Sequence, residues 1–288
     1  MLLTKEIRKT IVLALNEDSA RRDITTSLAI PKATRIKVEI IAKEKGLLCG
    51  IEVAKAVFKQ INKKVIFKAL KKDGATLKPG QRVAIIAARA RDILAAERVA
   101  LNFLSFLSAV ATNTEKFVHQ SKGNKAIIMD TRKTIPNLRQ LQRYAVLVGG
   151  GRNHRSCLSG AVLIKDNHLR IGRYLNKGKL DDKKIAKLVK NFRKKSSGKI
   201  EIEIEELSEF RQVAQAKPDI IMLDNFSLAD LKKAVSMRNE SFPRLKLEAS
   251  GGITLKNVRA VARSGVDRIS IGCLTHSLKS IDFSLEVI

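Results

Sequence analysis

The chain has 288 residues, of which 44% are hydrophobic and 29% are charged, which suits one large globular domain or two smaller ones. Its 56 lysines and arginines against 28 acidic residues give a formal net charge of +28, which attracts anions but fixes no fold. Aromatic residues reach only 4% and tryptophan is absent, so stacking surfaces for single-stranded RNA are poorly supplied.

Cysteine usage and hydropathy argue against a secreted or membrane protein. Cys49, Cys157 and Cys273 are far apart and form neither a zinc pattern nor a disulfide framework, which favours a reducing, cytoplasmic location. Charged residues interrupt the N-terminus, so no signal peptide is expected. The longest apolar candidate for a membrane span, residues 94–111, is broken by Glu97, Arg98 and Asn102.

The first third of the chain mixes helical and strand periods. Helices are expected at 4–16 and 51–61, strands at 35–43, 64–70 and 82–88, and a polar loop at 17–26. Residues 91–120 have a long helical period that suggests two helices in sequence. Within it Arg98 follows Glu97, and a solvated position or an internal ion pair would explain this arginine.

Beyond residue 120 apolar runs alternate with helical periods. Strands are expected at 126–129, 161–164, 200–204, 219–223, 246–249 and 267–271, and helices at 138–148, 183–192, 207–216, 228–237 and 255–264. This alternation predicts a parallel sheet with crossover helices. An incomplete (β/α) barrel fits best, with a doubly wound open sheet as the alternative. The lysine-rich segment 181–195 fits a barrel helix with a solvated basic face.

Cationic and polar residues cluster where the predicted strands end. Asp130-Thr131-Arg132-Lys133 follows the first strand of this half, His154-Arg155 precedes the next, and Lys165 to His168 follows it. A barrel gathers the carboxyl ends of its strands at one face, where active sites lie. The pattern therefore predicts a site for a small, densely anionic ligand.

Carboxylates stand on two of the same strands. Glu201, Glu203 and Glu205 alternate and would line the barrel interior, which is costly unless cations or a metal pair with them. Glu203 and Asp224 could bind Mg²⁺, stabilise a carbocation or accept ribose hydroxyls, or could form internal salt bridges. No cysteine and histidine cluster suggests zinc, and His154, next to an arginine, is better explained as a hydrogen-bond donor.

The segment 248–253, Glu-Ala-Ser-Gly-Gly-Ile, ends one strand and is expected to open a helix. Ser250, Gly251 and Gly252 would offer backbone N–H groups to a phosphate. Gly272 ends the next strand, and the last two strand ends of barrels often form a phosphate site. A tight turn alone would explain the two adjacent glycines equally well.

These motifs together resemble quinolinate phosphoribosyltransferase, also called carboxylating nicotinate-nucleotide pyrophosphorylase. The resemblance covers nearly the whole chain, from Asp23-Ile-Thr-Thr26 to Leu274-Thr-His-Ser277. The most specific parts are Glu97-Arg98, Asp130-Thr-Arg-Lys-Thr134, Gly149-Gly-Gly-Arg-Asn-His-Arg155, Leu163-Ile-Lys-Asp-Asn-His168, Met222-Leu-Asp-Asn-Phe226 and Glu248-Ala-Ser-Gly-Gly-Ile253.

The resemblance implies an α/β fold with an N-terminal α+β open sandwich domain and an incomplete (β/α) barrel. We expect the first at residues 1–107, with 279–288 returning to it, and the barrel at 108–278. The implied reaction joins quinolinate to phosphoribosyl pyrophosphate with Mg²⁺, giving nicotinate mononucleotide, pyrophosphate and CO₂ for NAD biosynthesis. A homodimer is implied, with a higher oligomer as the alternative, and Arg98 would reach the site of the neighbouring subunit.

The resemblance also implies a role for each matching residue. Quinolinate carboxylates would be bound by Arg98, Arg132, His154, Arg155 and Lys165. Lys133 and Lys165 would contact phosphoribosyl pyrophosphate, whose ribose would face Glu203 and Asp224. The 5′-phosphate would be bound by Ser250, Gly251, Gly252 and Gly272, with His276 nearby. Lys133, Lys165, Glu203 and Asp224 would be the catalytic residues, while Mg²⁺ would arrive mainly on phosphoribosyl pyrophosphate.

Three positions depart from the family pattern: Cys157 and Arg22 replace a common glycine, and Gly160 replaces a common acid. Two other functions compete with the first. A related barrel could use another acceptor, such as nicotinate, or be a molybdenum-transport-associated homologue, but Arg98, Arg132 and Arg155 together favour a dicarboxylate. A non-enzymatic RNA-binding protein is suggested only by the charge of +28, and it does not explain cations confined to strand ends.

Overall fold

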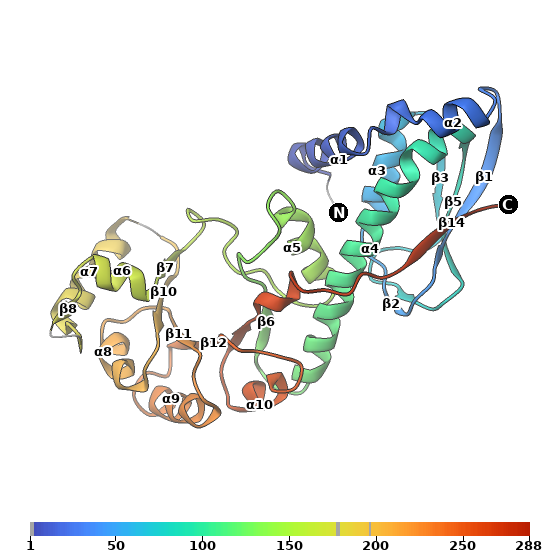
Figure 1. Cartoon of the computed structure of the whole chain (residues 1–288). Helices are drawn as coiled ribbons and strands as arrows, with labels where there is room; N and C mark the ends of the chain where they lie inside the picture. Colours follow the sequence, from blue (N-terminus) through green and yellow to red (C-terminus); the bar gives the residue numbers. More distant parts are fainter. Residues whose placement is uncertain (1–2, 177–178, 196) are drawn as a thin grey trace. The chain divides into compact units, whose positions relative to one another are not determined.

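The computed structural model describes residues 3–176, 179–195 and 197–288. The chain forms two compact units (Figure 1). The first unit consists of residues 1–115, 134–150 and 274–288, and the second of residues 116–133 and 151–273. Residues 108–115, 134–150 and 274–278, which we assigned to the barrel segment, therefore group with the first unit.

Contacts within the first unit explain why residues 134–150 belong to it. Helix α5 (Arg139–Val148) carries Tyr144, whose hydroxyl donates to Asp73 Oδ2 at 2.7 Å. Gln142 is fully buried and donates through Nε2 to the carbonyl oxygen of Thr275. Gly149, at the end of the helix, lies so close to Ala111 and Thr114 that a side chain there would overlap them.

An antiparallel four-stranded sheet forms the centre of the first unit, in the order β14-β1-β5-β3. The strands are β1 (Arg35–Ala42), β3 (Ile66–Ala69), β5 (Gln81–Arg89) and β14 (Phe283–Val287), with a small pair β2 (Gly46–Leu47) and β4 (Thr76–Leu77). Val38 of β1 lies opposite Val287, so the C-terminal segment adds the edge strand. The first unit also contains α1 (Lys5–Glu17), η1 (Ala20–Arg22), α2 (Ile24–Ala29) and α3 (Ile51–Ile61).

The expected polar loop at 17–26 is wrong, because η1 and the start of α2 occupy much of it. Asp23 begins α2 as its N-cap, and its carboxylate accepts the N–H of Thr26 at 2.9 Å. A capping aspartate satisfies one of the unpaired N–H groups of the first helical turn. This local signal was available in the sequence.

The expectation of two helices in 91–120 is also wrong, because a single helix, α4, runs from Ala90 to Ser121. No glycine or proline interrupts these residues. The polar side chains bond to other backbone groups: Ser108 Oγ accepts the N–H of Cys49 at 2.9 Å, and Thr112 Oγ1 accepts that of Leu47 at 2.8 Å. These residues thus attach neighbouring chain to the helix without ending it.

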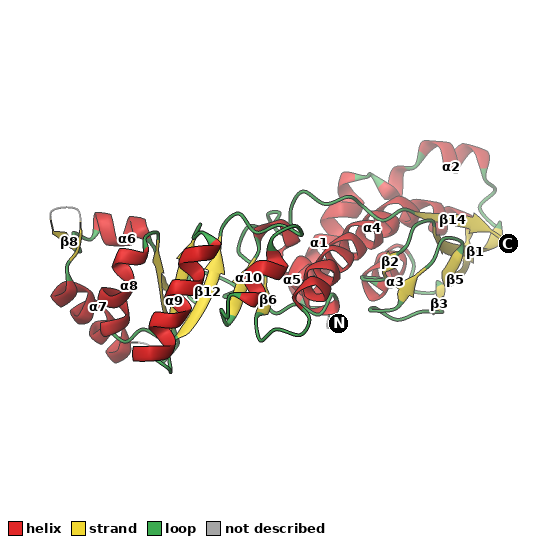
Figure 2. Cartoon of the chain, turned by 90° about the horizontal axis from the view of Figure 1, so that it is seen from below, coloured by secondary structure: helices red, strands yellow, loops and turns green. Residues whose placement is uncertain are grey.

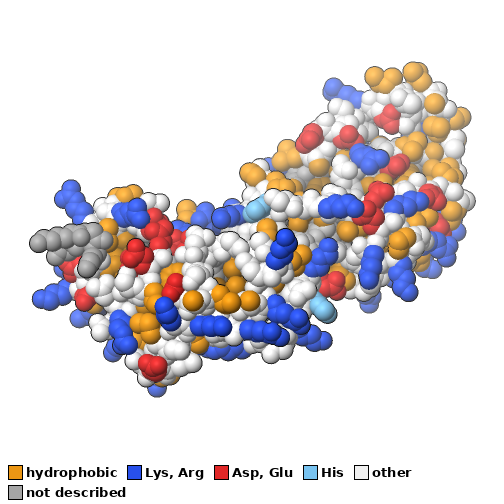
Figure 3. All heavy atoms as spheres, turned by 60° about the horizontal axis from the view of Figure 1, so that its bottom comes forward, with side chains coloured by type: hydrophobic (Ala, Val, Ile, Leu, Met, Phe, Trp, Pro, Cys, Tyr) orange, Lys and Arg blue, Asp and Glu red, His pale blue; other side chains and the backbone are white. Residues whose placement is uncertain are grey.

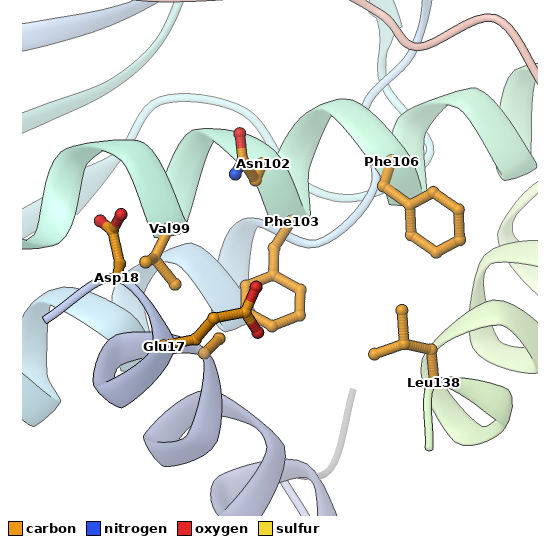
Figure 4. Close-up of a pocket in the computed structure, with 8 residues that line it drawn as sticks. Glu17, Asp18, Val99, Asn102, Phe103, Phe106 and Leu138 are labelled. Carbon is orange, nitrogen blue, oxygen red and sulfur yellow. The ribbon is translucent and has the colours of Figure 1, made fainter. Parts of the chain in front are cut away.

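Helix α4 is long and apolar enough to cross a membrane by length and composition alone, contrary to our expectation of no such segment. However, 61% of its most apolar window is buried inside the protein, as in the core helix of a globular fold. A pocket of about 340 Å³ lies beside it within the first unit, between Val99, Phe103 and Phe106 of α4 and Leu138 (Figure 4).

A six-stranded parallel sheet forms the centre of the second unit, in the order β6-β13-β12-β11-β10-β7 (Figure 2). Its strands are β6 (Ile127–Met129), β7 (Val162–Ile164), β10 (Ile200–Ile204), β11 (Ile220–Asp224), β12 (Lys246–Ser250) and β13 (Arg268–Ser270). In the described part of the chain no ladder joins β6 to β7, so the sheet is open, as expected for an incomplete barrel.

Crossover helices join most of the parallel strands, as predicted, and α8, α9 and α10 lie along one side of the sheet (Figure 1). The second unit contains α6 (Asp166–Ile171), α7 (Asp182–Lys195), η2 (Leu207–Glu209), α8 (Phe210–Gln215), α9 (Leu228–Ser241) and α10 (Val258–Arg263), with a hairpin of β8 (Leu175–Asn176) and β9 (Lys179–Leu180). The short helix η3 (Gly272–Leu274) spans the boundary between the two units in the chain. Helix α6 was not predicted, because it is one short turn beside a strand end.

Lysines and arginines are spread over both units on the face shown in Figure 3, among acidic and hydrophobic side chains. In helix α7, Ile185 and Val189 are buried while the lysines around them are exposed. This confirms a solvated basic face for that segment.

Candidate active site at the carboxyl edge of the parallel sheet

Charged side chains form a layer inside the parallel sheet of the second unit. Glu203 of β10 pairs in register with Met222 of β11, Met222 with Glu248 of β12, and Glu248 with Arg268 of β13. Residues paired across neighbouring strands point to the same face. Glu203 and Glu248 are 5% and 0% exposed, so this face is the buried interior.

Asp130 fixes the first strand end. It directly follows β6, is fully buried, and accepts the backbone N–H of His154 at 2.6 Å. The backbone groups of Asp130 and Arg152 are hydrogen-bonded as well, at 3.0 Å. The loop that carries His154 and Arg155 is therefore held beside the end of β6 by a buried carboxylate.

Two arginines come close to each other here. Burial lowers the pKa of Arg155, and the positive charge of Arg132 lowers it further. Arg155 Nη1 donates to the carbonyl oxygen of Ala161 at 3.3 Å, just before β7. Because like charges repel, two partly buried guanidiniums near enough to affect each other's pKa favour a site that receives an anion.

His154 lies between two buried carboxylates. Its Nε2 is 3.1 Å from Glu201 Oε2 and 3.3 Å from Glu248 Oε1. Burial lowers the pKa of His154, but the hydrogen bond of Glu201 and the nearby carboxylates of Glu201 and Glu248 outweigh burial and raise the pKa to about 10. The two carboxylates thus favour the cationic form of the imidazole.

The ends of β7 and β10 meet in an ion pair. Lys165 follows β7, and its Nζ contacts Glu203 Oε2. Burial raises the pKa of Glu203, whereas Lys165 lowers it, and the negative charge of Asp224 raises it again. One of the internal salt bridges that we kept open for Glu203 is thus present, and Asp224 lies near enough to act on Glu203.

The loops after β11 and β12 pack closely against each other at Gly251. The Asn225 N–H donates to the carbonyl oxygen of Ser250 at 2.8 Å. Gly251 has a φ of +83°, and a side chain there would overlap the Asn225 amide oxygen. Only glycine therefore suits this position, on both conformational and steric grounds.

The loop after β12 does not open a helix at once, contrary to our expectation, because α10 begins only at Val258. Asn257 instead donates from Nδ2 to the carbonyl oxygen of Gly252 at 2.9 Å and accepts the N–H of Thr254. Gly272 begins η3 after β13. The Cys273 thiol contacts the Ile253 carbonyl oxygen at 3.7 Å, so the loops holding Gly252 and Gly272 are neighbours.

The remaining predicted residues are less closely tied to this edge. Lys133 is exposed beyond β6. His168 accepts the backbone N–H of Lys165 through Nδ1 at 2.9 Å and so caps α6. Arg98 and His276 are exposed residues of the first unit, and His276 hydrogen-bonds the Ser277 hydroxyl at 3.1 Å.

Sequence reasoning missed the partners of His154. It placed Glu201 in the interior without a role, mentioned Glu248 only within a motif, and did not use Arg268. The sequence feature that could have indicated these partners is the presence of three acids in strands β10 and β12, Glu201, Glu203 and Glu248, whose side chains are all buried. Pairing these acids with His154 required the strand register and the loop path.

The loop with the unusual Cys157 and Gly160 forms a turn in which the Gly160 N–H donates to the Cys157 carbonyl oxygen at 3.3 Å. Both residues are exposed. Hydrogen bonds with Ser159 and Ser156 lower the pKa of the Cys157 thiol to about 7. Arg155, just before this turn, keeps its contact with Ala161.

Comparison with known proteins identifies the family. Residues 23–108 match the model of the quinolinate phosphoribosyl transferase N-terminal domain, and residues 110–286 match that of the C-terminal domain. The carboxylating nicotinate-nucleotide pyrophosphorylase of Mycobacterium leprae is 36% identical over 97% of this chain and 96% of its own length.

An archaeal relative and a solved structure agree with this result. The probable carboxylating nicotinate-nucleotide pyrophosphorylase of Methanocaldococcus jannaschii is 39% identical over 97% of this chain and 96% of its own length. The nicotinate-nucleotide pyrophosphorylase structure from Francisella tularensis superimposes with a TM-score of 0.88 at 39% identity, over 98% of this chain and 96% of that one. The chain therefore belongs to the quinolinate phosphoribosyltransferase family.

Proposed function

We propose that this protein catalyses the decarboxylating transfer of a phosphoribosyl group from phosphoribosyl pyrophosphate to quinolinate, a step of NAD biosynthesis. The observation that carries the proposal is that the buried Asp130 carboxylate holds the loop of His154 and Arg155 beside the end of β6, where Arg132 and Lys133 follow in the chain. Three cationic groups around one position suit a small dianion, and planar guanidiniums bind carboxylates with two parallel hydrogen bonds.

The quinolinate carboxylates would be bound by Arg132, His154, Arg155 and Lys165. His154 is held by the Asp130 carboxylate through its backbone and by Glu201 through its ring. A donor fixed in this way loses little conformational freedom when the ligand binds. One carboxylate would thus stay bound while the other leaves as CO₂.

Phosphoribosyl pyrophosphate would lie toward β10, β11 and Lys133. Lys133 and Lys165 would neutralise its phosphates, and Glu203 and Asp224 would face the ribose. When the quinolinate nitrogen bonds to C1 of the ribose, the bond from C1 to the pyrophosphate oxygen breaks, and pyrophosphate takes that electron pair. Positive charge develops on the ribose as this bond breaks, and the two carboxylates stabilise it electrostatically.

Decarboxylation would follow at the ring carbon next to the new bond. The electrons of the bond to CO₂ remain on that carbon, where the adjacent cationic ring nitrogen stabilises them, and a proton then takes the place of CO₂. The protein contributes by holding the remaining carboxylate with its cations. Its work in both steps is positioning and electrostatic stabilisation, without a covalent enzyme intermediate.

The 5′-phosphate would bind where the loops after β12 and β13 meet. Ser250, Gly251, Gly252 and Gly272 would offer a hydroxyl and backbone N–H groups, with His276 as a further donor. The proximity of the two loops through Cys273 and Ile253 supports this assignment. The steric requirement for Gly251 keeps the backbone open to a ligand.

Mg²⁺ would neutralise pyrophosphate as it leaves. Magnesium prefers oxygen ligands and retains several waters, which the exposed carboxyl edge could accommodate. The protein carboxylates here are already engaged, since Glu203 contacts Lys165 and Asp224 accepts the Asn225 amide at 2.9 Å. We therefore assign the ion mainly to the oxygens of phosphoribosyl pyrophosphate.

We further propose a homodimer and a cytoplasmic location. Arg98 is an exposed cation on α4, which is otherwise largely buried. It would reach the quinolinate of the neighbouring subunit and complete the set of arginines. The three cysteines are free thiols, in keeping with a reducing compartment.

Product analysis with two acceptors tests the function. The protein is incubated with phosphoribosyl pyrophosphate, Mg²⁺ and either quinolinate labelled in its 2-carboxylate or nicotinate. We expect labelled CO₂ and nicotinate mononucleotide in equal amounts from quinolinate, and little product from nicotinate. Product from nicotinate alone would overturn the proposal in favour of a barrel with another acceptor.

A further inference from the structure

A buried group of four ionisable side chains lies inside the second unit: His154, Glu201, Glu248 and Arg268. Glu201 and Glu248 are 4% and 0% exposed. Both approach the same imidazole nitrogen, Nε2 of His154. Arg268 Nη1 lies 3.8 Å from the other oxygen of Glu248. His154 comes from a loop, whereas the other three side chains come from strands β10, β12 and β13.

The carboxylates depend on His154 for compensation. Glu201 Oε1 and both oxygens of Glu248 accept no hydrogen bond from any described residue. Buried carboxylates are costly unless cations pair with them. With His154 protonated, the four side chains carry two negative and two positive charges. With His154 neutral, one negative charge remains uncompensated in the interior.

Some of the charged groups around His154 favour protonation of its ring, and others oppose it. Asp130 accepts its backbone N–H, and Arg155 is its neighbour in the chain. The positive charge of Arg155 opposes protonation of the ring, whereas Glu201 and Glu248 favour it. Burial also raises the pKa of Glu201, and the charge of Glu248 raises it further.

We propose that Glu201 and Glu248 are positioning residues that fix His154 as an imidazolium, with Nε2–H toward the interior and Nδ1–H left for a substrate carboxylate. A neutral imidazole with its proton on Nε2 would present a lone pair at Nδ1 and repel that carboxylate. The two glutamates thus determine that His154 donates. The inference rests on the proposed function for the identity of the ligand, but the state of His154 can be measured without substrate.

The same atoms could in principle hold a metal ion. The ligand atoms of His154, Glu201 and Glu248 all lie within 4.8 Å of one another. The nearby cations Arg132, Arg155 and Arg268 argue against a further divalent charge. The charge balance of the four side chains is already complete with a proton, so we assign the proton.

The first experiment uses the unmodified protein. Histidine labelled with ¹⁵N and ¹³C is titrated by NMR from pH 5 to 10, and the signal of His154 is assigned by its loss in His154→Asn. The protein has four histidines, so the other three serve as internal references. We expect His154 to remain doubly protonated at pH 8. A titration near the ordinary value of about 6.5 would overturn the proposal.

The second experiment removes each negative charge while keeping the shape, with Glu201→Gln and Glu248→Gln. Loss of one carboxylate should lower the pKa of His154, so the imidazolium is lost as pH rises from 6 to 8. The KM for quinolinate should then rise roughly tenfold over this range, the scale of losing support for a ligating side chain. The KM for phosphoribosyl pyrophosphate should stay within about twofold.

Glu205→Gln is the matched control. Glu205 is on the same chain segment but is exposed and contacts Arg170 at 3.3 Å, so the pH profile should match that of the unmodified protein. Equal increases in the KM for quinolinate and the KM for phosphoribosyl pyrophosphate, with an unchanged pH profile, would show a merely structural role and overturn the proposal. A stoichiometric metal in the purified protein that both glutamine variants lose would also overturn it.

The two proposals fail differently. If the protein does not convert quinolinate but the His154 signal remains doubly protonated at pH 8, the proposed function fails while the imidazolium stands. If quinolinate is converted normally and His154 titrates near its ordinary value, the function stands and the positioning role fails.

Discussion

The two edges of the parallel sheet both carry charge clusters, but of opposite character. At the amino edge, Asp267 precedes β13 and is paired by Arg238 at 2.7 Å, Lys246 at 3.2 Å and the Leu247 N–H at 2.9 Å. At the carboxyl edge, Arg132 and Arg155 approach each other, and buried Glu248 accepts no hydrogen bond from any described residue.

The charges around Asp267 at the amino edge neutralise one another, whereas at the carboxyl edge the charge of Arg132 lowers the pKa of Arg155. Like charges held near each other by the rest of the fold gain when an opposite charge arrives. In barrels the carboxyl edge is the functional one and the amino edge the stabilising one, and the two edges of this sheet differ in the same sense.

The largest effect on stability should come from the amino edge. Arg238→Ala leaves Asp267 buried with fewer partners, and the free energy of unfolding should fall by about 3 kcal/mol. Urea unfolding measures this change. Both KM values should remain within about twofold of the unmodified protein. Arg211→Ala, which removes an exposed arginine from α8, is the control. It should change neither the free energy of unfolding nor the KM values. A changed KM for quinolinate in Arg238→Ala would contradict the assignment of a stabilising role to the amino edge and a functional role to the carboxyl edge.

The largest effect on activity should come from the carboxyl edge. Arg132→Ala should lower kcat/KM for quinolinate at least ~100-fold, equivalent to about 2.7 kcal/mol, because one charged ligand contact is lost. Its free energy of unfolding should change less than that of Arg238→Ala, since Arg155 loses a repelling neighbour. Steady-state kinetics and urea unfolding are compared with Arg263→Ala, an exposed arginine at the end of α10. Near-normal kinetics would refute the assigned role.

Acid should weaken the amino edge selectively. Burial raises the pKa of Asp267, but hydrogen bonds from Leu247, Lys246 and Arg238 outweigh it and lower the pKa overall. An acid with a lowered pKa contributes stability above its unfolded pKa of about 4, and this contribution is lost as pH falls further. The stability difference between the unmodified protein and Asp267→Asn should therefore shrink from pH 5 to pH 2. A constant difference in urea unfolding would contradict this.

The smallest effect should come from a surface pair at the amino edge. Arg193 lies 2.7 Å from Asp219, and their side chains are 41% and 32% exposed. Arg193→Ala should cost less than about 1 kcal/mol, because solvent screens the pair and Asp219 still accepts the Ile200 N–H. The cost should vanish in 1 M salt. A loss comparable to that of Arg238→Ala would show that pairing, without burial, sets the stability.

The sequence by itself determined the elements and the edge on which the site lies. Strand β10 and helix α3 have the predicted bounds, because apolar periodicity is a local property of the chain. The polar motifs at Asp130, Lys165, Asp224 and Ser250 directly follow or end their strands. Since parallel strands share a carboxyl edge, their convergence could be predicted without coordinates.

Only the tertiary structure decided which charges meet. The Asp130 contact that brings His154 to the buried carboxylates joins residues 24 apart in the chain, and the His154–Glu201 contact joins residues 47 apart. Helix α4 is one continuous helix, and its polar side chains Ser108 and Thr112 accept hydrogen bonds from backbone N–H groups that are distant in the sequence. Local sequence patterns determine which helix, strand or loop carries a side chain. The residue that it contacts depends on strand register and loop path, which are properties of the whole fold.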